Sequence, residues 1–311
     1  MTGEDRVDQF ARDIQTSPEA LATLLAAPRP APVSADGRIC LTGLGSSRYA
    51  ADIVAGAWRA AGRTAWTELA SGAQRTRPAV DLTLIAISAS GGTPEVVEAA
   101  RRHRGTSRVI AVTNRADSAL AAVADEVVLL HAGVEASGIA CRTFRATLAA
   151  LHLLGGGPED ALQPLPNAIA GRLPQTMDWA ADAADAIDGA PAIDVLADAA
   201  LGSLAEQAAL MLREGPRLPA HACETADWLH VGVYLAWPGH VVMRYPGSAA
   251  DAELERTLRA RGVRLIDVPA TSQEGSDPIA RAIVTSVDAE VLAQRLWART
   301  GVVEPGDDKA T

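Results

Sequence analysis

Cysteine and lysine are scarce in this sequence. Its 311 residues include three cysteines, and their positions (40, 141 and 223) lack the spacing of a metal site or a disulfide framework. This usage is typical of a reducing compartment, so we expect a cytoplasmic protein without a metal site. Lys309 is the only lysine, and every other basic residue except histidine is arginine. A reaction that needs a primary amine is therefore limited to Lys309 or the α-amino group, because arginine stays protonated.

Long apolar runs and an excess of positive charge are also missing. No apolar run approaches the ~20 residues of a membrane-spanning helix, and the N-terminus, MTGEDRVDQF, is too polar for a signal peptide. The net charge of −10 argues against nucleic acid and against an anionic membrane surface as partners. A hydrophobic fraction of 48% is ordinary for a soluble globular protein, and the length allows more than one domain.

Apolar strands alternate with amphipathic helices through the first half of the chain. Residues 6–27 show helical spacing interrupted by Ser17-Pro18, which predicts two short helices. The predicted strands cover 38–42, 64–70, 81–88, 107–114 and 126–132, and the predicted helices cover 48–62, 94–104, 118–124 and 141–154. The alternation predicts an α/β fold with a doubly wound parallel sheet, which helices cover on both faces.

The same alternation resumes after a break rich in glycine and proline at 155–165, which we expect to connect two domains. Further strands are predicted at 192–198, 240–246 and 263–269, and further helices at 201–215, 249–262 and 278–301. The expected division is N-terminal helices at 1–30, a first domain at 31–155, a second domain at 166–300 and a polar tail at 301–311. The similar order of elements indicates two tandem units and an internal duplication.

The sequence ISASGGT (87–93) joins a predicted strand directly to a predicted helix. Ligands of open parallel sheets bind beyond the carboxyl ends of the strands, next to helix N-termini. Free N–H groups and the positive end of the helix dipole favour a phosphate there, and Ser88, Ser90 and Thr93 add hydroxyl groups. A helix N-cap explains one such hydroxyl but not the whole cluster, so we predict a phosphate site.

A second glycine turn, GLGSSR at 43–48, allows a different interpretation. Gly43 and Gly45 fit the first two glycines of the dinucleotide-binding fingerprint, but Arg48 takes the place of the third. A bulky side chain there opposes the close approach of helix and strand. We therefore favour a sugar phosphate over a dinucleotide and expect no cofactor.

Taken in order, these motifs resemble the sugar isomerase (SIS) domain family. The resemblance is carried by GLGSSRYAADIVAGAW, TELAS, IAISASGGTPEVV and VIAVTNRADSALAAVADEVVLLHAG. Within that family the chain resembles the isomerase half of glucosamine-6-phosphate synthases, with DIQTSPEAL and GIACRTFRATLAALHLL as further matches. The similarity spans essentially the whole chain, strongly in the first unit and loosely in the second. It implies two flavodoxin-like SIS units.

The resemblance also implies roles for residues of the first unit. The hydroxyls that hold the sugar phosphate in the family match Ser47, Ser88, Ser90 and Thr93. Ala89 stands where the family usually has glutamine, so one donor is lost.

In the second unit, EQAALMLREGPRLPAHACETADWLH resembles the family's catalytic segment. Glu214 matches the glutamate that shuttles a proton, and His230 matches the histidine that opens the sugar ring. Aldose–ketose isomerisation needs residues of these two types, a carboxylate between C2 and C1 and an acid/base at the ring. Without the resemblance, we would interpret Glu214 as a solvated charge at a helix end and His230 as a partly buried structural histidine.

Besides Ala89, the chain departs from the family in three places. We expect the N-terminal glutaminase domain to be absent, since Met1 is followed by Thr2 rather than by a catalytic cysteine. Met211 replaces a helix lysine three positions before the glutamate. Lys309 lies close to the place of the family's Schiff-base lysine, about one residue away, and is our candidate for that role.

Two functions of different classes fit these observations. The leading hypothesis is an enzyme that isomerises or deaminates a phosphorylated hexose or aminohexose, such as fructose 6-phosphate or glucosamine 6-phosphate, without a Lys309 imine. The alternative is a sugar-phosphate-binding regulatory protein that has lost the chemistry, which Ala89 and Met211 favour. The resemblance implies a homodimer in which His230 is donated to the neighbouring subunit's site.

Overall fold

The computed structural model describes residues 3–73, 75–271 and 277–300. These residues form two compact units, each built around a parallel sheet. The five-stranded unit comprises residues 17–134 and 142–166. The four-stranded unit comprises residues 3–16, 135–141 and the described part of 167–300. The first helix and a short internal segment thus belong to the unit of the second sheet.

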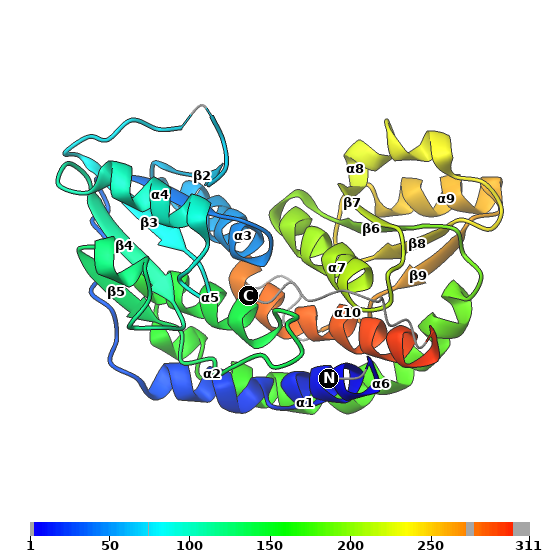
Figure 1. The fold of residues 1–311 in the computed structure, drawn as a ribbon. Coiled ribbons are helices and arrows are strands. Elements are labelled where there is room, and N and C mark those ends of the chain that lie inside the picture. The colour runs from blue at the N-terminus through cyan, green and yellow to red at the C-terminus, as the bar shows by residue number, and fades with distance from the viewer. Residues whose placement is uncertain (1–2, 74, 272–276, 301–311) are drawn as a thin grey trace. The chain divides into compact units, whose positions relative to one another are not determined.

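The five-stranded unit has strand order β2-β1-β3-β4-β5, and every neighbouring pair is parallel (Figure 1). Its strands are β1 (Arg38–Gly43), β2 (Ala65–Leu69), β3 (Leu82–Ile87), β4 (Arg108–Thr113) and β5 (Glu126–Leu129). Its helices are α2 (Ser17–Ala26), α3 (Ser46–Ala60), α4 (Pro94–His103) and α5 (Arg142–Leu154), with short 3-10 helices η1 (Ala121–Val123) and η2 (Glu159–Ala161). The order reverses between β1 and β3, and such a reversal is where ligands of open α/β sheets bind.

The central strands of this sheet are buried on both faces. Ala86, Val109 and Ala111 pack with the apolar side of α4. Ile85 and Ile110 point to the opposite face, because side chains alternate along a strand, and both are fully buried as well. This double burial is the reason for the continuous apolar runs in the sequence.

The four-stranded unit has strand order β7-β6-β8-β9, again parallel throughout. Its strands are β6 (Ile193–Ala197), β7 (Ala220–Glu224), β8 (Val241–Arg244) and β9 (Arg264–Asp267). Its helices are α1 (Gly3–Gln15), α6 (Leu165–Ile187), α7 (Gly202–Glu214), α8 (Thr225–Trp228), α9 (Asp251–Arg261) and α10 (Pro278–Thr300), with 3-10 helices η3 (Ala199–Leu201) and η4 (Gly232–Leu235).

Helices cover the two faces of this smaller sheet in pairs. On one face Trp228 of α8 and Leu254 and Leu258 of α9 pack with Leu196 and Val242 of the strands. Helices α7 and α10 pack together on the opposite face (Figure 1). The sheet therefore separates α7, which ends at Glu214, from α8, which ends two residues before His230.

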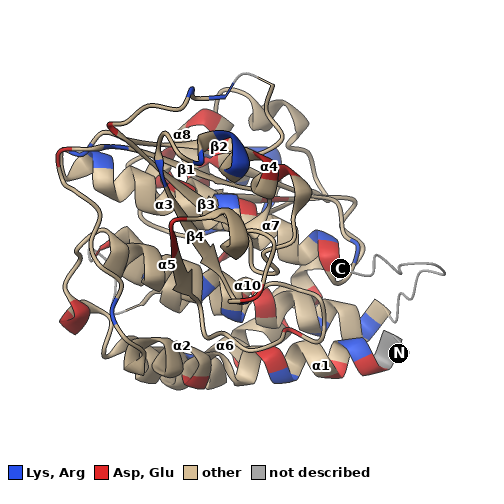
Figure 2. Cartoon of the chain, turned by 60° about the vertical axis from the view of Figure 1, so that its left-hand side comes forward, with Lys and Arg blue, Asp and Glu red and all other residues tan. Residues whose placement is uncertain are grey.

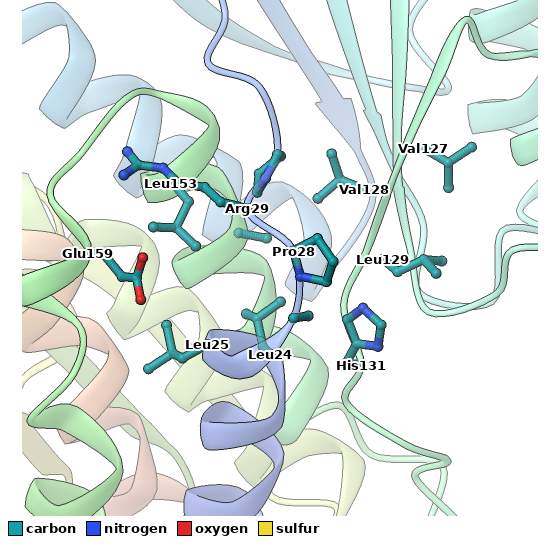
Figure 3. Close-up of a pocket in the computed structure, with 13 residues that line it drawn as sticks. Leu24, Leu25, Pro28, Arg29, Val127, Val128, Leu129, His131, Leu153 and Glu159 are labelled. Atoms are coloured by element: carbon teal, nitrogen blue, oxygen red, sulfur yellow. The ribbon is translucent and has the colours of Figure 1, made fainter.

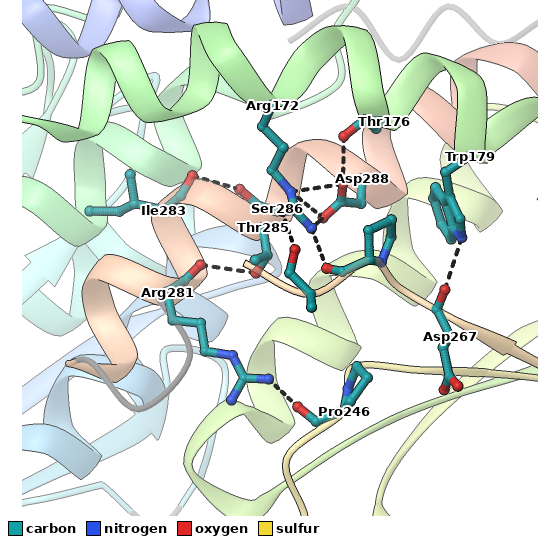
Figure 4. Close-up of polar contacts among 12 residues, drawn as sticks. Arg172, Thr176, Trp179, Pro246, Asp267, Arg281, Ile283, Thr285, Ser286 and Asp288 are labelled. Atoms are coloured by element: carbon teal, nitrogen blue, oxygen red, sulfur yellow. Dashed lines mark hydrogen bonds and ion pairs between the residues drawn. The ribbon is translucent and has the colours of Figure 1, made fainter. Parts of the chain in front are cut away.

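A buried ion pair joins α6 to α10 (Figure 4). Arg172 donates to both carboxylate oxygens of Asp288 at 2.9–3.0 Å, and its side chain is 6% exposed and that of Asp288 0%. Thr176 adds a hydrogen bond to Asp288 at 2.6 Å. Arg172 also donates to the carbonyls of Pro269 and Ala270, so the pair fixes the chain that follows β9.

The structure differs from the predicted elements at residues 118–124, in α6 and in β7. Residues 118–124 form only the 3-10 helix η1, because the Leu120 amide is held by the Gly91 carbonyl at 2.9 Å and β5 begins soon afterwards. Helix α6 was not predicted. It contains Pro174, which is exposed, and buried residues recur every three to four positions along the helix. Strand β7 was not predicted; its parallel register with β6 makes it an edge strand.

Charged residues of both signs are interspersed along the described chain, as α1 illustrates (Figure 2). No helix among the described residues is long and apolar enough to cross a membrane.

Candidate functional site

The turn between β3 and α4 brings three of the predicted hydroxyls together. Ser88 and Thr93 place their side-chain oxygens 2.8 Å apart, and Ser88 is buried. Ser90 is exposed and accepts a hydrogen bond from the Gly92 amide at 3.2 Å. Thr93 is the N-cap residue of α4 but makes no side-chain cap bond, and Pro94 opens the helix. The Thr93 hydroxyl is therefore not consumed by capping.

Residues at and after the end of β4 fix the backbone of this turn. The Ala89 carbonyl accepts hydrogen bonds from the Asn114 amide at 3.0 Å and from the Thr113 hydroxyl at 3.3 Å. Gly91 adopts φ +63°, and a Cβ atom there would overlap the Ser118 side chain and lie 2.8 Å from the Thr113 hydroxyl. The turn thus requires a glycine, both for its backbone angle and for the space that Ser118 occupies.

The turn between β1 and α3 lies beside it. A Cβ atom at Gly43 would be 3.1 Å from the Ser47 Cβ and 3.3 Å from the Ile87 carbonyl, so the start of α3 and the end of β3 are neighbours. Ser47 is in the first turn of α3 and is half-buried. The strand order reverses between β1 and β3, so all four predicted hydroxyls flank the switch point of the sheet.

Donors other than hydroxyls are available in the same two turns. The amides of Ser90 and Thr93 have no hydrogen-bond partner among the described residues. The first amides of α3 and α4 add the positive ends of two helix dipoles. Arg48, the one basic side chain in the first turn of α3, is paired with Asp52. The turns therefore suit a phosphate through amides and hydroxyls rather than through a free cation.

Glu214 ends α7 in the four-stranded unit and is half-buried. Burial, and to a smaller extent the neighbouring carboxylate of Glu135, raise the pKa of its carboxyl from the usual 4.5 to about 7. Arg217, Arg213 and Arg6 act in the opposite direction without cancelling this rise. A carboxyl with a pKa near neutrality is suited to take and return a proton at neutral pH.

A short segment, residues 135–141, lies against α1 and α7 beside Glu214. The Ser137 hydroxyl and amide donate to the buried Asp13 carboxylate at 2.8 and 3.2 Å. Gln207 of α7 donates to the Ala140 carbonyl at 3.1 Å, and the Cys141 amide donates to Glu135 at 2.6 Å. These bonds fix Glu135 on the same unit as Glu214.

His230 is exposed, two residues after α8, and its amide donates to the Asp227 carbonyl at 2.9 Å. Since α8 and α7 cover opposite faces of the four-stranded sheet, that sheet lies between His230 and Glu214. One chain therefore does not bring these two residues together. Lys309 lies outside the described residues.

A separate cavity of about 370 Å³ lies in the five-stranded unit, next to the edge strand β5 (Figure 3). It is mostly apolar, with Leu24, Val128 and Leu153 in its wall and Arg29 and Glu159 among its few charged lining residues. None of the predicted site residues lines it. The candidate site is therefore the pair of hydroxyl-rich turns and not this cavity.

A parallel sheet in this order, with hydroxyl-rich turns at its switch point, places the five-stranded unit among the flavodoxin-like ligand-binding α/β folds. Residues 33–155 match the SIS domain family, so the chain contains a SIS domain and belongs to the SIS proteins. The match covers the five-stranded sheet with all four predicted hydroxyls.

Two curated relatives are glutamine–fructose-6-phosphate aminotransferases. The protein from Aeropyrum pernix is 30% identical over 230 residues, which are 68% of this chain and 37% of the relative. The protein from Gloeobacter violaceus is 27% identical over 254 residues, 70% of this chain and 41% of the relative. The chain thus spans less than half the length of these relatives.

Solved structures share the fold at low identity. The C-terminal domain of glucosamine-fructose-6-phosphate aminotransferase from Francisella tularensis has a TM-score of 0.81 at 18% identity, covering 94% of this chain and 96% of that one. The glucosamine-6-phosphate deaminase from Thermotoga maritima has a TM-score of 0.77 at 17% identity, covering 94% and 95%.

Sequence reasoning missed the residues that support the site. Thr113 at the end of β4 and Ser118 in the segment after it shape the turn between β3 and α4, and the only signal for their role was the glycine pair that they pack against. Glu135 was missed because no spacing in the sequence ties it to Glu214.

Proposed function

We propose that this protein is an enzyme that acts on a phosphorylated hexose or aminohexose, by aldose–ketose isomerisation or by deamination. The observation that carries the proposal is the hydroxyl-rich pair of turns at the switch point between β1 and β3. Relatives named as fructose-6-phosphate aminotransferases, and a fold shared with a glucosamine-6-phosphate deaminase, support fructose 6-phosphate and glucosamine 6-phosphate as first substrates to test.

In this proposal the two turns hold the phosphate through Ser47, Ser88, Ser90 and Thr93. Each hydrogen bond to a charged group is worth ~1.5–3 kcal/mol, so a few such bonds bind a phosphate without a basic side chain. We also propose that the two units are tandem, doubly wound SIS units and that the protein is cytoplasmic.

The chemistry is assigned to Glu214 and His230. Glu214, with a pKa raised to about 7 by burial, moves a proton between C2 and C1 of the open-chain sugar. His230 opens the ring as acid and base. Because the sheet separates the two residues within one chain, the proposal includes a homodimer in which His230 serves the partner subunit's site.

A non-catalytic regulatory protein is the second candidate. Ala89 removes one donor from the phosphate turn, and Met211 is fully buried where the resembled family has a lysine.

One experiment separates the two functions. A thermal-shift series with hexose and aminohexose 6-phosphates identifies the ligand, and turnover of that ligand is then followed for the native protein and for Glu214→Gln. The enzyme predicts turnover that Glu214→Gln abolishes while the thermal shift persists. Binding without turnover by the native protein supports the regulatory function instead.

A Schiff base at Lys309 is not part of the proposed mechanism. Borohydride reduction in the presence of fructose 6-phosphate, read by intact mass, tests this point. We expect no adduct; an adduct that disappears in Lys309→Ala would establish an imine mechanism in its place.

A further inference from the structure

The five-stranded unit is slightly basic in a chain that is otherwise acidic. Its residues, 17–134 and 142–166, contain 14 arginines and 12 acidic residues, a balance of +2. Since the whole chain has a net charge of −10, the remaining residues carry −12. A partner that is itself negatively charged is therefore repelled by most of this chain and attracted only where the arginines of the five-stranded unit are free to bind it.

Most arginines of this unit already have a partner. Ten of the 14 make an ion pair, a hydrogen bond or a contact with an aromatic ring. The other four are exposed, and no ion pair or side-chain hydrogen bond joins any of them to another described residue. These four are Arg77, Arg101, Arg102 and Arg104.

A buried hydrogen-bond network holds Arg77 against the C-terminal end of α4. His103, in the last turn of α4, is 3% exposed; its Nδ1 lies 3.0 Å from the Ser107 hydroxyl, and the ring also bonds the Thr76 backbone. The Ala79 amide donates to the same Ser107 oxygen at 3.1 Å. Arg77 lies between Thr76 and Ala79, so both of its flanks are fixed beside the helix end.

Helix α4 supplies the other three arginines. Arg101 and Arg102 are in its last turn, and Arg104 follows it. Glu98, one turn earlier, forms no ion pair with any of them. The dipole of α4 accounts for cations at its C-terminal end, but not for Arg77, which comes from the connection between β2 and β3. Together the four side chains form what we call the arginine patch.

Exposure and charge decide which ligand fits the arginine patch. Exposed ion pairs are individually weak, so a small anion gains little there, whereas a chain with several acidic groups contacts all four guanidinium groups at once. A nucleic acid or an anionic membrane extends far beyond four side chains and would meet the acidic remainder of the protein. Residues 70–81 and 94–107 also contain no Phe, Tyr or Trp on which bases could stack.

We propose that the arginine patch is a docking surface for an acidic peptide segment of a partner protein, since clustered guanidinium groups bind carboxylates well. The patch lies at the C-terminal end of α4, while the turn between β3 and α4 precedes its N-terminal end. The 10 residues of α4 separate the two by about 15 Å. The surface is therefore distinct from the candidate site and does not depend on the proposed function.

The test is the binding of a fluorescent octaglutamate peptide to the full chain, measured by anisotropy at low salt. Arg77→Gln with Arg102→Gln should weaken this binding by roughly tenfold. Arg256→Gln with Arg259→Gln is the matched control, because both positions are exposed on α9 of the four-stranded unit and the net charge changes equally. The control should leave peptide binding unchanged.

Competition identifies the class of partner. Unlabelled octaglutamate should displace the fluorescent peptide at lower concentration than a single-stranded DNA octamer or phosphatidylserine vesicles do. Octaglutamine, which has the same length and no charge, should not displace it. A stronger effect of the DNA or of the vesicles would overturn the acidic peptide and make a nucleic acid or a membrane the partner.

Two further results would overturn the docking surface and leave the proposed function standing: a native protein that does not bind octaglutamate, or equal losses of binding in the two double variants. A loss confined to Arg77→Gln with Arg102→Gln, in a protein that no sugar phosphate stabilises, supports the surface and contradicts the proposed function alone.

Discussion

Ser118 occupies the space that a side chain at Gly91 would need. The glycine has φ +63°, and its carbonyl accepts a hydrogen bond from the Leu120 amide, so the turn between β3 and α4 packs against the segment after β4. The turn keeps its shape only if both the angle and the space are preserved.

Gly91→Ala should therefore cost about 2 kcal/mol or more and should abolish the response to sugar phosphates. Gly105→Ala is the control, since Gly105 has φ +79° but no atom within 4 Å of a Cβ there. It should cost only ~1–2 kcal/mol from the backbone angle and leave ligand binding intact. Urea unfolding and thermal shift measure the two effects, and equal costs for both variants would contradict the packing argument.

Ser90→Ala with Thr93→Ala should remove the thermal stabilisation given by a sugar phosphate and leave the melting temperature of the free protein nearly unchanged. Ser90 is exposed, and the Thr93 side chain makes no cap bond, so neither hydroxyl contributes much to folding. Ser34→Ala with Thr106→Ala removes two exposed hydroxyls that precede β1 and β4, at the opposite edge of the same sheet, and is the control. A ligand response that persists in the first double variant would place the phosphate elsewhere.

The five-stranded sheet could be predicted because each strand and each turn is marked by its own residues. Strands such as 81–88 are nearly continuously apolar, and the small residues after them mark the turn. The position of Glu214 relative to His230 could not be predicted in this way, because it depends on which face of the sheet α7 and α8 cover. Helix α6 was missed for a related reason: burial of one side outweighs the local cost of Pro174, and burial is not a local property.

The raised pKa of Glu214, about 7, predicts two pH dependences of opposite sense. Turnover should rise with pH through about 7, because the base must be ionised. Stability should fall as pH rises from about 4.5 to 7, because the folded protein binds a proton that the unfolded chain releases. Glu214→Gln should remove this part of the stability slope, as measured by urea unfolding at several pH values. A slope unchanged in Glu214→Gln would show that other groups cause it.

Arg172→Leu should destabilise the protein by ~3–5 kcal/mol, because it leaves the Asp288 carboxylate buried without its cation. Arg38→Leu is the matched control, since the Arg38–Asp81 pair is 45% and 59% exposed and such pairs contribute ~0–1 kcal/mol. Urea denaturation compares the two. Similar losses would contradict the argument that burial of the Asp288 carboxylate without the Arg172 cation is costly.

The last prediction concerns the division of one site between two chains. Glu214→Gln and His230→Ala should each be inactive alone, and a mixture that exchanges subunits should recover activity. Half of the dimers in an equal mixture are mixed, and each mixed dimer has one site with both an intact Glu214 and an intact His230. About a quarter of the native rate is therefore expected. A mixture of Glu214→Gln with the double variant Glu214→Gln, His230→Ala is the control and should stay inactive, since no dimer in it holds an intact Glu214. If subunit exchange is shown by mass and the first mixture still stays inactive, the two residues do not share a site across the dimer.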